Sequence, residues 1–146
     1  MEQVLDRLRY ITSDVNELVG AVTFGESRLH QFHDALDTME SDIATIKHYR
    51  HYQTCTDEHR RVHAMLNTTL ESLISWRALA WQYLQELNSL SVNMHHAAYF
   101  ILQTTEQQLN QLIKNLYLHI QQLEQMQTRL SRFYQQLNHH KRVLPA

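Results

Sequence analysis

Apolar residues recur at alternating intervals of four and three along the first third of the chain. This is the heptad spacing that places one stripe of a helix against a partner helix. Because the phase continues through Gly20 and Gly25, the pattern predicts one helix over residues 2–50. The series consists of Val4, Leu8, Ile11, Val15, Leu18, Val22, Gly25, Leu29, Phe32, Leu36, Met39, Ile43 and Ile46, of which only Gly25 is not apolar.

A second helix is predicted after this rhythm stops at Ile46. Thr54 or Thr56 can cap a helix, and Asp57 and Glu58 place negative charge in its first turn. We therefore expect a connector near residues 51–56 and a helix over 56–88. Its apolar arc is broad, which is typical of contact with two neighbours. The arc includes Val62, Leu66, Leu70, Leu73, Ala80, Leu84 and Leu87, with Trp76, Trp81 and Tyr83 beside it.

A third helix is predicted over residues 92–140. Asn and Ser side chains between 88 and 93 compete for backbone hydrogen bonds and favour a break there. The alternative is that the second and third helices are continuous. The third seam follows the same alternation of three and four, through Leu109, Leu112, Leu116, His119, Leu123, Met126, Leu130, Phe133 and Leu137.

The expected fold is all-α, an elongated antiparallel helical bundle or coiled coil of two or three long helices. We expect a single helical domain over residues 1–146. Helices this long cannot enclose a core alone, so they must lie side by side within one chain or between chains. Two glycines and one proline in 146 residues leave too few turn residues for a β-sandwich, a barrel or a doubly wound α/β fold.

Charge and cysteine content limit the partners and the compartment. Thirteen Lys and Arg against fifteen Asp and Glu give a net charge of −2, which creates no general attraction to nucleic acid or an acidic membrane. The basic group His139 to Arg142 is explained by the dipole of a helix C-terminus. No apolar stretch is long enough to span a membrane. The lone Cys55 and the absence of a signal-peptide pattern at the N-terminus predict an intracellular, cytoplasmic protein.

Four histidines form the candidate metal site. His59 and His63 lie four residues apart on one helical face. If the chain reverses near Cys55, His48 and His51 on the preceding helix reach a similar height opposite them. Such a set could hold zinc or copper. The alternative is that these are exposed polar residues at a helix end in a chain with eleven histidines.

No enzyme and no cofactor are predicted. Cys55 has histidines near it in sequence, but a connector between long helices offers neither a pocket nor a group of backbone amides that could stabilise an oxyanion. Asp34 and Asp37 are interpreted as part of a solvated face.

The sequence therefore predicts a non-enzymatic protein–protein association module, an oligomerising or adaptor subunit of a larger assembly. Its partners would be copies of itself or other helical subunits, and Leu29→Asp with Leu36→Asp should dissolve the assembly. One alternative is a metal- or pH-responsive bundle, and another is an accessory chaperone that masks a client helix. The predicted interface consists of Leu8, Ile11, Leu18, Leu29, Phe32 and Leu36, then Leu112, Leu116, Leu123 and Leu130, and the aromatic residues Trp76 and Trp81. The alternative for both tryptophans is a place in the internal core, more strongly for Trp76 than for Trp81.

Overall fold

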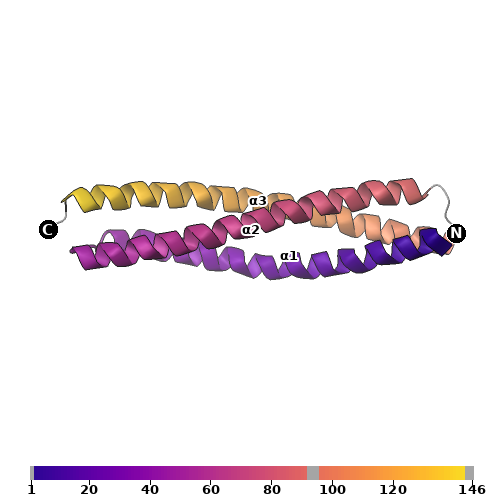
Figure 1. Ribbon diagram of the computed structural model, residues 1–146, viewed down its shortest axis with the longest axis horizontal. Helices are drawn as coiled ribbons and strands as arrows, with labels where there is room; N and C mark the ends of the chain where they lie inside the picture. The colour runs from indigo at the N-terminus through magenta and orange to yellow at the C-terminus, as the bar shows by residue number, and fades with distance from the viewer. Residues whose placement is uncertain (1, 92–95, 144–146) are drawn as a thin grey trace. The chain divides into compact units, whose positions relative to one another are not determined.

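Three long helices make up the chain in the computed structural model, which describes residues 2–91 and 96–143 (Figure 1). They are α1 (Glu2–Ile43), α2 (Tyr49–Leu90) and α3 (His96–Val143). The described residues contain no strand. The all-α bundle of long helices is thus confirmed. The alternative of one continuous rod after the first helix is wrong, because α2 ends at Leu90 and α3 packs back in the same compact unit.

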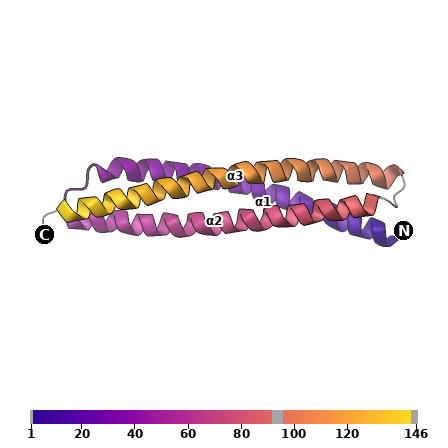
Figure 2. The ribbon, with the colours of Figure 1, turned by 90° about the horizontal axis from the view of Figure 1, so that it is seen from above.

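The chain divides into two compact units, and each helix contributes a segment to both. Unit 1 consists of Met1–Gly25 and Ser72–Ile120, and unit 2 of Glu26–Glu71 and Gln121–Ala146. Within each unit, segments of α1, α2 and α3 pack side by side (Figures 1 and 2). Each unit is therefore a three-helix bundle in cross-section.

The core of each unit includes the heptad stripe that the sequence predicts for α1. Every position of the α1 series from Leu8 to Ile43 is buried, including Gly25, and so is Ile46 beyond the helix end. In α2 the prediction is wrong at two places, where Thr69 and Tyr83 are buried and their neighbours Leu70 and Leu84 only half-buried. Thr69 tolerates burial because its hydroxyl donates to the backbone carbonyl of Met65 at 2.9 Å.

The first connector lies earlier than predicted. The helix expected over 2–50 ends at Ile43, and the one expected over 56–88 begins at Tyr49. Thr45 closes the first helix, with its amide 2.9 Å and its hydroxyl 2.7 Å from the carbonyl oxygen of Asp42. The apolar rhythm misplaces the end because Ile46 continues it while lying in the connector. The expected third helix, 92–140, is observed as His96–Val143, and residues 92–95 lie outside the described part of the chain.

The threonines that suggested a helix start lie inside α2 instead. The hydroxyl of Thr54 donates to the carbonyl of Arg50 at 3.2 Å, and that of Thr56 to the carbonyl of Tyr52 at 3.0 Å. A threonine hydroxyl can satisfy an N-terminal amide or a carbonyl four residues earlier, so its presence alone does not locate a helix start.

Polar contacts in unit 1 set the register between helices. Arg7 on α1 makes a bidentate ion pair with Glu86 on α2, with atoms 2.6 and 2.8 Å apart. Further along α1, Asp14 accepts a hydrogen bond from the phenol of Tyr83. Residue numbers rise on α1 as they fall on α2, so these two helices are antiparallel.

Unit 2 has its own contacts between helices. Arg129 on α3 donates to Asp37 at 2.8 Å and to Glu40 at 2.9 and 3.1 Å, both on α1. Asn67 on α2 accepts a hydrogen bond of 2.8 Å from Gln127 on α3. These contacts tie α3 to both of the other helices.

Candidate functional site

The four histidines of the predicted metal site are placed as two separate pairs. His48 lies in the connector and His51 in the first turn of α2, with ring centroids 6.0 Å apart. His59 and His63 stack at 5.9 Å further along α2. Because the chain reverses at residues 44–48 rather than near Cys55, His51 lies on the same helix as His59 and not opposite it. The structure therefore does not bring the four rings together.

One other trio of potential metal ligands lies close together among the residues that the structure describes. His33, Asp34 and Asp37 have ligand atoms within 4.8 Å of one another on the exposed surface of α1. Asp37 is already engaged, by Arg129 and by His33 at 3.2 Å. The hydrogen bond from Arg129 is the main cause that lowers the pKa of Asp37. This trio is thus part of the ion-pair network that links α1 to α3.

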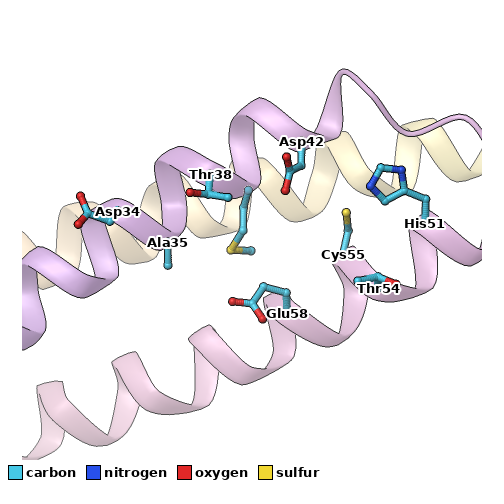
Figure 3. A pocket seen from close by; sticks show the side chains of 9 residues that line it. Asp34, Ala35, Thr38, Asp42, His51, Thr54, Cys55 and Glu58 are labelled. Atoms are coloured by element: carbon cyan, nitrogen blue, oxygen red, sulfur yellow. The ribbon is translucent and has the colours of Figure 1, made fainter.

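A groove between α1 and α2 in unit 2 contains the lone cysteine. It encloses about 440 Å³. Small side chains at Ala35 and Cys55 leave this space between the helices, and side chains from both helices point toward it (Figure 3). The lining residues are Asp34, Ala35, Thr38, Met39 and Asp42 from α1, and His51, Thr54, Cys55 and Glu58 from α2.

The chemistry of the groove is that of a polar rim around an unreactive thiol. Burial, with a smaller contribution from Asp42, raises the pKa of Cys55, so the thiol stays protonated at neutral pH. In the described part of the chain no hydrogen bond joins Cys55 to a base. Arg61 donates to Glu58 at 2.5 and 3.1 Å, and this bond lowers the pKa of that carboxyl. The absence of an enzyme activity stays a prediction.

His59 occupies a position in the α2–α3 seam of unit 2. Its ring lies 4.8 Å from the Tyr134 ring and 6.1 Å from the Phe133 ring, measured between centroids. Partial burial is the main cause that lowers the pKa of His59, and the neighbouring His63 adds to the effect. Sequence reasoning placed His59 at a hairpin neck, whereas it lies between helices as a half-buried, neutral ring at pH 7.

The leucine seams predicted as an interface form the internal core of the chain. All ten of these aliphatic and phenylalanine positions are buried, with exposed fractions between 0% and 7%. Leu29 and Leu36 both lie in unit 2, so placing aspartates there is now expected to unfold that unit rather than separate subunits. Trp76 is half-buried and Trp81 is 49% exposed. Of the predicted interface residues, Trp81 is the one that remains open on the surface.

The exposed apolar side chains are concentrated in unit 1. Ten of the twelve large ones in the described part of the chain lie there, the exceptions being Met65 and Tyr134. Sequence reasoning singled out one of them, Trp81. It missed the others because most of them are sequence neighbours of buried heptad positions, and the regular spacing of those buried positions dominates the pattern. The ten are Tyr10, Val19, Phe24, Ile74, Trp81, Tyr99, Phe100, Ile101, Tyr117 and Leu118.

Charged residues show the opposite distribution. Unit 1 has six Asp, Glu, Lys and Arg residues in 1–25 and four in 72–120, whereas unit 2 has thirteen in 26–71 and five in 121–146.

None of the described helices combines the length and hydrophobicity needed to cross a membrane. No family model, no curated protein and no solved structure matches the chain.

Proposed function

We propose that this protein is a non-enzymatic protein–protein association module, an oligomerising or adaptor subunit whose contact surface is the exterior of unit 1. The observation that carries the proposal is the group of ten exposed apolar side chains on a unit with few charges. Single exposed apolar residues are ordinary, but a concentration of them is typical of interaction sites. Tryptophan and tyrosine are also the residues that most often anchor an interface.

The internal seams support this choice of surface. Association through the leucine seams would require each unit to open, which would expose side chains such as Leu8 and Leu123 that are 1% exposed or less. Burial of an apolar side chain contributes about 1.5–3 kcal/mol. The exterior of unit 1 can associate without that loss.

Photocrosslinking tests the proposal. A photoreactive phenylalanine analogue is placed at Phe100 in unit 1, which is 70% exposed, and at Arg60 in unit 2 as the control, whose side chain is 78% exposed. In cells that express the protein, we expect adducts from position 100 well above those from position 60. Equal adducts from both positions, or none from either, would contradict the proposal.

The chaperone alternative uses the same surface with a different partner. A chaperone would hold an aggregation-prone helix of a client, so its crosslinks would be to a client that aggregates in its absence. An adaptor would crosslink to a stably folded subunit. The identity of the adduct and its behaviour alone therefore separate these two roles.

A second candidate function, a pH-responsive bundle, is supported by His59. Its ring packs on Phe133 and Tyr134, and protonation would place a charge in this half-buried contact. We also propose an intracellular, cytoplasmic location, supported by the single free cysteine, Cys55.

A further inference from the structure

One side of unit 1 combines exposed aromatic residues with two charges that have no partner among the described residues. Asn67 of α2 contacts α3, so residues at steps of seven from it, Ile74 and Trp81, lie on the side of α2 that faces α3. Both are exposed, by 41% and 49%. Arg77 lies between them on the same side, because it is three residues from one and four from the other.

The matching side of α3 follows from the same reasoning. Gln127 and Tyr134 contact α2, and steps of seven back along α3 lead through the buried Ile120 to Ile113, Glu106 and Tyr99. Tyr99 is 40% exposed, and Tyr117, one turn after Ile113, is 53% exposed. We call this surface the aromatic face, and define it by Ile74, Arg77, Trp81, Tyr99, Glu106 and Tyr117.

The two charges of the aromatic face are unpaired within residues 2–91 and 96–143. Arg77 and Glu106 are both half-buried, and neither forms an ion pair or a hydrogen bond through its side chain in the described part of the structure. In the same unit, Arg7 and Glu86 pair with each other. Partly desolvated charges without partners are costly, so a partner that neutralises both would bind favourably.

The contacts in unit 1 also separate the two charges along the helix axis. On α1, Thr12 contacts Thr105 of α3, and Asp14 contacts Tyr83 of α2. Because α1 and α2 are antiparallel, residue 105 of α3 lies at about the same height along the bundle as residue 85 of α2. Glu106 therefore lies between one and two turns away from Arg77, on the neighbouring helix. A two-fold axis that passes between them exchanges their positions.

From this arrangement we propose that the aromatic face binds a second copy of itself in a two-fold symmetric dimer, in which Arg77 of each copy pairs with Glu106 of the other. The proposal rests on the proposed function and names its partner. The charge pattern is self-complementary, with one cation and one carboxylate, and an isologous contact forms such a pair twice. The aromatic and aliphatic side chains between the charges lose their contact with water in the same step.

The size of the aromatic face predicts a weak dimer. From Tyr99 to Tyr117, α3 extends about 27 Å, and two adjacent helices are about 20 Å wide. The footprint is on the order of 500 Å², below the roughly 800 Å² per partner of a standard stable interface. We therefore expect association in the micromolar range rather than a permanent dimer.

Sedimentation equilibrium of the full chain with reversed charges tests the proposal. We expect the wild type to show a monomer–dimer equilibrium. Arg77→Glu alone and Glu106→Arg alone should each weaken it by at least about tenfold, because each creates two like-charge contacts. An equimolar mixture of the two variants should recover a dimer, since every contact in the mixed dimer joins opposite charges. Recovery on mixing cannot arise from a contact within one chain.

Lys114→Glu is the matched control, because Lys114 is exposed on α3 outside the aromatic face, and the dimer should persist. Circular dichroism checks that each variant keeps its helicity. If a charge reversal unfolds the chain, Trp81→Gln replaces it as the test and should weaken the dimer by a similar factor. A wild type that remains monomeric at every concentration, or a dimer indifferent to these changes, would overturn the proposal.

The two proposals fail in distinguishable ways. If the wild type is monomeric but position 100 still crosslinks to another protein more than position 60 does, the surface associates and the second copy is the wrong partner. If the wild type is monomeric and neither position crosslinks, both proposals are wrong.

Discussion

At the scale of single residues, the fold accommodates polar side chains in its seams by giving each one a partner. None of the buried side-chain nitrogen or oxygen atoms in the described residues lacks a hydrogen bond. Thr105, which is 1% exposed, donates to the carbonyl of Ile101 at 2.9 Å and lies 3.1 Å from the hydroxyl of Thr12. The heptad spacing predicted which positions are buried in α1. It could not predict these pairings, because they depend on which helices become neighbours.

Tyr83 gives a residue-scale prediction for unit 1. Tyr83 is 6% exposed, and its phenol donates a hydrogen bond to Asp14. Burial is the first cause, and Asp14 the second, that raises the pKa of Tyr83, so the phenol is neutral at every physiological pH. Tyr83→Phe removes the donor and should lower the free energy of unfolding by about 1–2 kcal/mol in urea titrations.

Tyr117→Phe is the matched control for this change, since Tyr117 is 53% exposed. Its effect should stay within about 0.5 kcal/mol. Equal effects of the two substitutions would mean that the contact between Tyr83 and Asp14 contributes nothing to stability.

His59 gives a prediction about pH. Its pKa in the folded protein is below the usual value of about 6.5, so the unfolded chain binds the proton more readily. The part of the stability that depends on a neutral His59 is therefore fully present above about pH 6.5. It is lost as the pH falls below that value, because the unfolded chain then takes up the proton first. Between about pH 8 and pH 5.5, the thermal midpoint of His59→Gln should fall less than that of the wild type.

The exposed His30 supplies the comparison for this experiment. His30→Gln should retain the pH dependence of the wild type. If His59→Gln loses as much stability on acidification as the wild type does, protonation of His59 is not the cause, and the pH-responsive function loses its support.

At the scale of elements, the sequence predicts the number and type of helices better than their ends. Three long heptad patterns could be recognised, because burial imposes the same spacing over many turns. The first connector could not be located, because Ile46 continues the spacing beyond the last helical residue, Ile43. That shift of the connector moves His51 onto α2, and with it the predicted four-histidine arrangement disappears.

The two glycines of α1 give an element-scale prediction. Neither has a positive φ. A Cβ at Gly20 would meet no atom within 4 Å, and one at Gly25 would lie 4.0 Å from Cδ2 of Leu73, an ordinary contact. Alanine therefore fits both positions, and each substitution should raise the free energy of unfolding by about 0.5–1 kcal/mol.

Urea unfolding of Gly20→Ala, Gly25→Ala and the double variant checks this expectation. The two gains should add, because the positions share no contact partner in the structure. A loss of stability for Gly25→Ala would show that the helices need the closer approach that only glycine permits.

At the scale of the whole molecule, association stays a prediction, and the surface proposed for it is the exterior of unit 1 in place of the leucine seams. The chain has two sets of apolar residues, one buried in the seams and one on the surface. Composition does not distinguish them, whereas the packing of the helices does. Leu112 and Leu130, predicted as interface, face inward, while Phe100 and Tyr117 face water. The sequence could not separate a seam that closes within one chain from a seam that joins two chains, since both follow the heptad spacing.

The central claim is that one chain completes its own core and that association is a secondary, surface contact. A dilution series that records mass by light scattering and helicity by circular dichroism tests it most directly. On dilution into the low micromolar range and below, we predict a mass approaching the 17.4 kDa of one chain with undiminished helicity. Helicity that disappears together with the larger species would contradict the account, because it would mean that the leucine seams are shared between chains.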